Sequence, residues 1–236
     1  MGLDVYVGSL SRYYTHDWET IIQKTAREQG MESLVLRLNE IWAKQPEKEE
    51  VYGLVHLWQQ MLKRTLAKHT PERVEWNEDP NADYSTDKPG WEGLWALRLW
   101  AAHDEQPKHA RPRTLPINPE RSKAYKACAS STFKSRYSHA LREIDLWLPI
   151  AVRFTFAMKN VGGAAIEIGS SVSLATQLDD LNARTWKAGA SDIDAWSVKG
   201  PPEDNDFEAT ARFGFAVFHR LANEAMIKRT PMLLDY

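Results

Sequence analysis

The chain has 236 residues, of which 43% are hydrophobic and 26% are charged, so it can bury a core and does not have the composition of a disordered protein. Its formal net charge of −2 makes nucleic acid an unlikely partner. No apolar run reaches the roughly 18–20 residues that a membrane span requires, and the N-terminus lacks the pattern of a secretion signal. A single cysteine, Cys128, excludes an intramolecular disulfide. We therefore expect a cytoplasmic protein that does not contact membranes.

Two short strands are predicted near the N-terminus. Residues 3–7 alternate apolar and polar side chains and predict an internal strand, which directs Asp4 and Tyr6 to its less buried face. Alternating leucines over 34–38 indicate a second short strand, although the residues that follow leave a helix possible.

Two helices are predicted in the same half of the chain. The first lies near 17–29, where Thr15 or Asp17 can cap its start and Gly30 can end it. The second lies near 47–68 and has an acidic start. Its apolar stripe consists of Val51, Leu54, Val55, Trp58, Met61, Leu62 and Leu66.

Two further helices and three loops are predicted from their composition and spacing. Apolar spacing predicts helices near 91–102 and 206–229. Proline, glycine and polar residues predict loops at about 70–90, 104–120 and 189–205. We expect the whole chain to form a single globular domain with these polar loops on its surface.

The strongest local pattern lies in the C-terminal half. Residues at about 148–168 predict a β-hairpin whose turn holds Asn160 and two glycines, because alternating side chains flank residues that tolerate positive φ. A helix near 171–186 follows, with Ser170 or Ser171 as its cap. The predicted fold is α+β: a small mixed or antiparallel sheet, built from the N-terminal strand and the hairpin, packs against about five helices.

The chain contains none of the spaced motifs typical of nucleotide binding, zinc proteolysis or serine hydrolysis. Titratable and aromatic residues nevertheless gather around the first strand and the helix after it, where His16 could act as a base oriented by a carboxylate. The candidates for a ligand pocket are Asp4, Tyr6, Tyr13, Tyr14, His16, Asp17 and Trp91. The simpler interpretation is that these residues start a helix and form a packed rim.

Potential metal ligands occur only in pairs. His139 and Glu143 are four residues apart, and His103 and His109 flank a charged turn. Because a metal site needs three or four converging ligands, we expect neither a metal nor another cofactor.

The segment 108–136 is strongly basic. It holds eight Lys or Arg and one acid, Glu120, whereas the rest of the chain holds 22 basic and 31 acidic residues. Aromatic residues lie between the cations, which suits an acidic or otherwise complementary protein partner. The candidate binding residues are Lys123, Tyr125, Lys126, Lys134 and Arg136. Alternatively, acidic residues of the loop at 70–90 neutralise this segment within the fold.

Three segments, Met1–Gly8, Asp87–Trp91 and Pro231–Tyr236, resemble parts of bacterial proteins of this size. The resemblance suggests a bacterial protein and implies no functional residue. The missing catalytic motifs and the ten tryptophans favour a non-catalytic protein-binding module, of an immunity or adaptor type, that uses aromatic and charged surface patches. The alternative is a small-molecule enzyme or ligand-binding domain whose aromatic pocket is formed around Tyr6 and its neighbours.

Overall fold

The computed structural model describes residues 2–30, 47–71, 73–130 and 132–236. Within this part of the chain, six strands form one mixed sheet. In sheet order they are β2 (Ser85–Asp87), β1 (Asp4–Val7), β6 (Met232–Asp235), β3 (Leu146–Leu148), β5 (Ala165–Ser170) and β4 (Phe156–Lys159). Neighbouring strands are antiparallel except for the parallel pair β3 and β5. The predicted α+β fold with a mixed sheet is confirmed.

β1 lies inside the sheet, between β2 and β6, as predicted. Helices cover both faces of the sheet, so Val5 and Val7 pack into one apolar core while Tyr6 packs into the other. The prediction that Asp4 and Tyr6 occupy a less buried face is therefore wrong: Asp4 is only 8% exposed and Tyr6 is fully buried.

The predicted hairpin is formed by β4 and β5, in which Phe156 lies opposite Ile168. In its turn, Asn160 donates its N–H to the carbonyl of Ala164 at 2.7 Å, and Gly163 adopts a φ of 87°, which side chains disfavour. The residues before β4 do not extend the hairpin, because β3 is a separate strand that pairs with β5 in parallel. The capped helix that follows, α8 (Ser171–Arg184), is confirmed, and the Ser170 hydroxyl accepts the N–H of Ser173.

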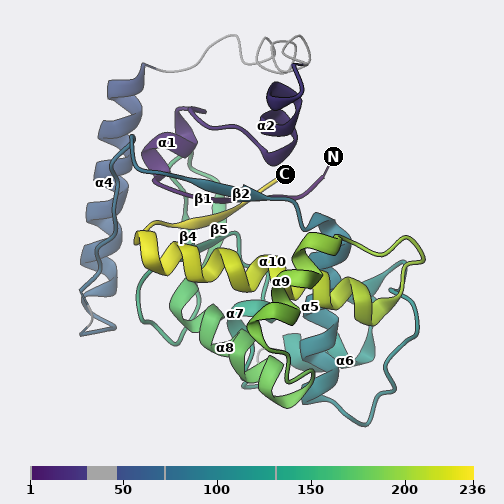
Figure 1. The fold of residues 1–236 in the computed structure, drawn as a ribbon. Helices are drawn as coiled ribbons and strands as arrows, with labels where there is room; N and C mark the ends of the chain where they lie inside the picture. The colour runs from purple at the N-terminus through teal and green to yellow at the C-terminus, as the bar shows by residue number, and fades with distance from the viewer. Residues whose placement is uncertain (1, 31–46, 72, 131) are drawn as a thin grey trace.

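The larger helical layer covers the face of the sheet that carries Val5 and Val7. Its main members are α5 (Gly90–Glu105), α8 and α10 (Phe207–Lys228), which lie below the sheet in Figure 1. Shorter elements complete this layer: η1 (Pro119–Arg121), α6 (Lys123–Ala129), α7 (Ser138–Leu141) and α9 (Ala190–Lys199). The helices predicted at 91–102, 171–186 and 206–229 are confirmed to within three residues at each end.

The opposite face of the sheet is covered by α1 (Leu10–Tyr14) and α4 (Lys48–Leu66), and Figure 1 shows α4 along one side of the molecule. α4 confirms the predicted helix at 47–68, but its buried stripe is narrower than predicted. Leu54 and Met61 are 46% and 52% exposed, because only the residues that face the sheet and the segment around Trp76 are covered.

The helix predicted at 17–29 is shorter than expected. α2 (Ile21–Glu28) begins after Thr20, whose hydroxyl accepts the N–H of Gln23 while the Gln23 side chain accepts the N–H of Thr20. The predicted caps, Thr15 and Asp17, are not used, since Thr15 ends α1 instead. Gly30 follows α2 with a φ of 74°, in agreement with the predicted end.

Two predicted loops contain regular structure that the sequence pattern did not indicate. β2 lies within 70–90 and α9 lies within 189–205, and β6 follows α10 where no strand was predicted. The strand predicted at 34–38 lies outside the described residues. In the part of the chain that the structure describes, no helix combines the length and apolar character needed to cross a bilayer.

Candidate functional site

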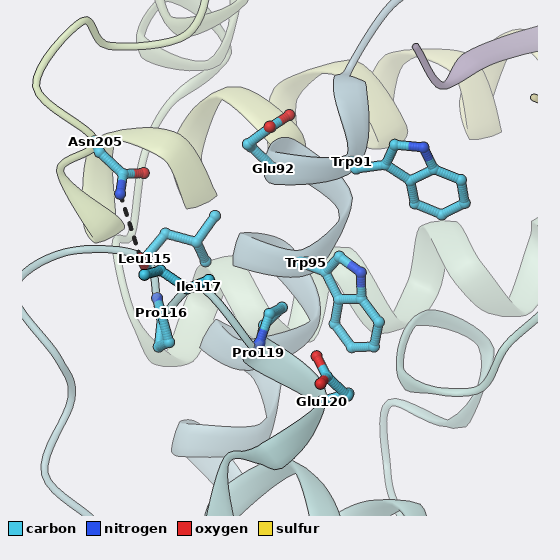
Figure 2. A pocket seen from close by; sticks show the side chains of 9 residues that line it. All are labelled: Trp91, Glu92, Trp95, Leu115, Pro116, Ile117, Pro119, Glu120 and Asn205. Carbon is cyan, nitrogen blue, oxygen red and sulfur yellow. Dashed lines mark hydrogen bonds between the residues drawn. The ribbon is translucent and has the colours of Figure 1, made fainter. Parts of the chain in front are cut away.

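A pocket of about 480 Å³ lies on the outer side of α5. Trp91 and Trp95, one helical turn apart, project from α5 on the same side (Figure 2). In this view Leu115, Pro116 and Ile117 lie on the other side from the indoles, and Glu120 lies below Trp95. The lining residues are Trp91, Glu92, Trp95, Leu115, Pro116, Ile117, Pro119, Glu120 and Asn205. Most of these side chains are aromatic, aliphatic or proline, which is typical of sites that bind by shape and apolar contact.

The segment opposite the tryptophans is held by the start of α10. Thr114 and Asp206 form an antiparallel bridge, the Leu115 N–H donates to the Asn205 carbonyl at 3.2 Å, and the Phe207 N–H donates to the Arg113 carbonyl at 3.0 Å. The Asn205 side-chain amide also donates to the Leu115 carbonyl at 3.3 Å, which is the dashed line in Figure 2. Prolines on this segment restrict φ further, so the pocket is preorganised.

The two tryptophan rings are supported from behind by other rings. Trp91 meets Tyr236 edge to face at 5.2 Å between ring centroids, and Trp95 meets Tyr125 in the same way at 5.2 Å. The Arg98 guanidinium lies 5.1 Å from the centre of the Trp95 ring. These contacts fix the orientation of both indoles.

The charged groups of this pocket are carboxylates. Glu92 and Glu120 lie at opposite ends of the side chains drawn in Figure 2, and no lining residue is cationic. Glu120 has an exposed ion pair with Arg121 at 3.8 Å, which contributes little to stability. Ile117 is 97% exposed at the rim, so the pocket adjoins an apolar side chain presented to solvent. The arrangement suits a ligand that carries a positive charge beside apolar groups.

The residues of this pocket were only partly predicted. Trp91 was among the ligand candidates, and the prolines of the loop at 104–120 were the one sequence signal for its opposite wall. Neither the aromatic pairing with Tyr236 nor the contribution of Asn205 is visible in the sequence, because both depend on how distant segments pack.

The other predicted ligand residues do not form a pocket around Tyr6. The Tyr6 ring packs at 4.8 Å from Trp18, 5.4 Å from Tyr13 and 6.0 Å from Tyr84, and its hydroxyl donates to the Ser9 carbonyl at 3.1 Å. The rings therefore fill the space that a ligand would need. Burial raises the pKa of Tyr6 and Tyr13 and raises that of Tyr14 to about 12, so these phenols stay protonated at neutral pH.

The ionisable candidates near Tyr6 are spread apart. His16 and Asp17 are exposed, and the Asp17 carboxylate pairs with Lys48 at 3.0 Å. Asp4 is buried in β1, 3.8 Å from Lys88. Burial raises the pKa of Asp4, and the Lys88 charge opposes this effect only in part. The structure thus does not bring His16 and Asp4 together in one buried site.

Tyr13 and Tyr14 instead line a smaller cavity of about 260 Å³ at the end of the sheet. There the Tyr13 hydroxyl donates to Asp235 at 2.8 Å and the Tyr236 hydroxyl donates to Asp145 at 3.0 Å. These two hydrogen bonds orient the phenol rings beside the cavity.

The basic segment keeps most of its charges on the surface. Lys123, Lys126 and Lys134 are exposed, and among the described residues none of them has a carboxylate within 4.0 Å. Arg136 is exposed and lies 3.7 Å from Glu105. Tyr125 is buried and donates its hydroxyl to the Leu141 carbonyl, so its ring supports the core and is not presented to a partner.

Acidic residues of the loop at 70–90 do not neutralise this segment, contrary to the alternative considered from the sequence. Glu78 accepts the backbone N–H groups of Leu10 and Ser11, and Asp87 pairs with Arg220. These carboxylates therefore bind other parts of the fold. The lysines of the basic segment therefore remain available to a partner.

In the part of the chain that the structure describes, the predicted pairs of metal ligands are not supplemented by further ligands. His139 is fully buried in α7, and His103 is buried with its Nδ1 at 3.1 Å from the His109 carbonyl. Within the described residues, no three His, Cys, Asp or Glu side chains converge in a geometry that could hold a metal ion.

Cys128 is buried, and its thiol lies 3.8 Å from the Ala102 carbonyl. Burial raises the pKa of its thiol to about 12, with a smaller contribution from the carboxylate of Glu105, so little thiolate is present at neutral pH.

We expect the native protein to react with Ellman's reagent at pH 8 at least about a hundredfold more slowly than the urea-unfolded chain, which should release one thiol equivalent. Fast reaction of the native protein would contradict this prediction.

The described structure is that of an α+β protein with helices on both faces of a mixed sheet and an aromatic, proline-lined pocket beside α5. Comparisons with protein-family models, with curated proteins and with solved structures found no match to this chain. The chemistry of the pocket is therefore the main guide to function.

Proposed function

We propose that this protein is a non-catalytic binding module that recognises a partner protein through the pocket on α5. The observation that carries the proposal is the combination of two indoles, a proline-rich wall and two carboxylates in one preorganised pocket with the exposed Ile117 at its rim. Aromatic anchors and preorganised walls are typical of the energetically important centre of protein interfaces.

The charges define what the partner should present. The carboxylates Glu92 and Glu120 suit an arginine or lysine side chain, which can also stack on an indole face. Lys123 follows Glu120 by three residues and is exposed, so acidic side chains beside the cationic one would match it. The proposed partner segment is thus apolar with one central cation and an acidic flank.

The alternative of a ligand-binding domain around Tyr6 has less support. Its candidate rings pack against one another, and His16 is exposed whereas Asp4 is buried. A site for catalysis would need an acid or base held beside open space, whereas His16, the candidate base, is exposed on the surface.

The proposal can be tested with short synthetic peptides. We expect a peptide with a central arginine between prolines and leucines to shift the indole N–H resonances of Trp91 and Trp95, and the same peptide with a central glutamate to bind at least about tenfold more weakly. Ile117→Ser should weaken binding of the arginine peptide about tenfold, equivalent to about 1.4 kcal/mol, because it removes an apolar contact at the rim.

Val198→Ser is the matched control, since Val198 is 89% exposed on α9 and does not line the pocket. It should leave peptide affinity unchanged. Equal binding of the arginine and glutamate peptides, or the absence of any shift at Trp91 and Trp95, would refute the proposed recognition.

A further inference from the structure

A third cavity, of about 550 Å³, lies between α2, β2 and α10. Its lining is rich in cations: Arg12, Lys24, Arg27, Arg220 and Lys228. Asp83 is the one acidic residue among the lining side chains, and Ser85 and Thr86 add hydroxyl groups. Segments distant in sequence therefore bring five positive charges to one concave surface.

Three of these cations are positioned by carboxylates that do not line the cavity. Arg27 binds Glu19 through its Nε at 3.0 Å, and Arg220 binds both Asp87 and Glu224. Lys228 lies 3.5 Å from Glu224 and also donates to the Ser85 hydroxyl. Burial alone would raise the pKa of Glu224, but hydrogen bonds from Ser85 and Arg220 and the nearby positive charges outweigh burial and lower it. These ionised pairs hold the side chains of α10 against the edge strand.

The other two cations are not neutralised. Among the described residues, neither Arg12 nor Lys24 has a carboxylate within 4.0 Å. Arg12 donates through Nη1 to the Ala82 carbonyl at 2.7 Å and lies over the Tyr84 ring at 5.1 Å, so its guanidinium is fixed while keeping its charge. The five cations face four nearby carboxylates, those of Glu19, Asp83, Asp87 and Glu224, so one net positive charge remains at the cavity. Two of the cations have no acidic partner, which favours binding of an anion.

We propose that this cavity binds a small molecule that carries phosphate groups. Of the two cations without an acidic partner, Arg12 has a planar guanidinium, which matches phosphate oxygens better than a point charge does. The volume lies within the range of about 300–1,000 Å³ that is common for small-molecule sites. A concave surface of this size favours a compact anion over an extended acidic segment of another protein.

Isothermal titration calorimetry with sodium pyrophosphate in 150 mM salt tests the proposal. We expect measurable binding of pyrophosphate, and acetate should bind at least about tenfold more weakly, because it carries a single negative charge. Lys24→Gln should weaken pyrophosphate binding about fivefold. Lys24 is exposed, so this substitution leaves the fold intact. Lys68→Gln, an exposed lysine beyond the end of α4, is the control and should have no effect.

Three results would overturn the proposal. The first is no binding of pyrophosphate at concentrations up to 10 mM, which is about the weakest affinity relevant to a metabolite site. The second is an equal loss of affinity in Lys24→Gln and Lys68→Gln, which would show nonspecific attraction. The third is tighter binding of a glutamate-rich peptide than of pyrophosphate, which would assign the cavity to an acidic protein segment. Comparison of pyrophosphate with a nucleoside diphosphate then separates recognition of phosphate alone from recognition of a larger phosphorylated ligand.

Discussion

Gly214→Ala is expected to lower the free energy of unfolding by about 3 kcal/mol or more, because it forces apart the two helices that organise the larger core. At this crossing α10 approaches α5 so closely that a Cβ on Gly214 would lie 2.1 Å from the carbonyl oxygen of Gly93 and 2.7 Å from its carbonyl carbon. The clashing atoms belong to the backbone of Gly93, which cannot move away as a flexible side chain can. Relief therefore requires a shift of one helix, with loss of contacts around Phe215 and Phe218.

The facing glycine provides the control. A Cβ on Gly93 would lie 3.5 Å from the Cα of Gly214 and 3.6 Å from the Phe213 ring, which are ordinary contacts. Gly93→Ala should therefore be neutral or stabilise the protein by up to about 1 kcal/mol, since alanine favours the helix. Urea unfolding of both variants, monitored by tryptophan fluorescence and by circular dichroism, measures the difference in their free energies of unfolding. Similar stabilities of the two variants would show that the helices are not in close contact at these glycines.

This crossing illustrates which parts of the fold the sequence predicts. The apolar stripes of α5 and α10 are local patterns with helical spacing, and both helices were predicted from them. Their mutual contact depends on two small residues that are far apart in the chain, and single glycines within helical patterns give no indication of a partner. Helices were thus predictable, whereas their packing was not.

The missed strands have a related explanation. β2 and β6 are only three and four residues long, and each forms because β1 provides a partner on either side. In β6, Met232, Leu233 and Leu234 are all buried, so its residues do not show the alternation of a strand with one exposed face. The candidate sites depend on the same long-range pairing. β2 contributes to the cavity between α2 and α10, and the segment after α9 holds the wall of the aromatic pocket.

The stability of the protein is expected to fall by about 3 kcal/mol between pH 6.5 and pH 4 through the titration of His139 alone. His139 is fully buried in α7, where its Nδ1 accepts the backbone N–H of Ser170 at 3.0 Å and its carbonyl accepts the indole N–H of Trp147 at 2.9 Å. It thereby joins α7 to the junction between β5 and α8. Burial lowers its pKa to about 4, assisted by the charge of Arg142 and opposed by the Arg153 backbone carbonyl.

The sign follows from proton binding in the two states. An unfolded histidine has a pKa near 6.5, so between pH 6.5 and pH 4 the unfolded chain binds more protons than the folded protein at this position. The contribution of neutral His139 is fully present above pH 6.5 and is lost as the pH falls toward 4. His139→Asn keeps an acceptor for the Ser170 N–H without the titration, so it should be less stable at neutral pH and show a flatter dependence on pH.

Urea unfolding of the wild type and of His139→Asn at several pH values between 7 and 4 measures how the free energy of unfolding of each protein depends on pH. The slopes of the two dependences are then compared. The ring resonances of His139 in the native protein supply a second measurement, because they should remain those of a neutral imidazole down to about pH 4. Parallel slopes for the two proteins, or a His139 ring that titrates near 6.5, would show that this junction is open to water and that the buried histidine does not link α7 to α8.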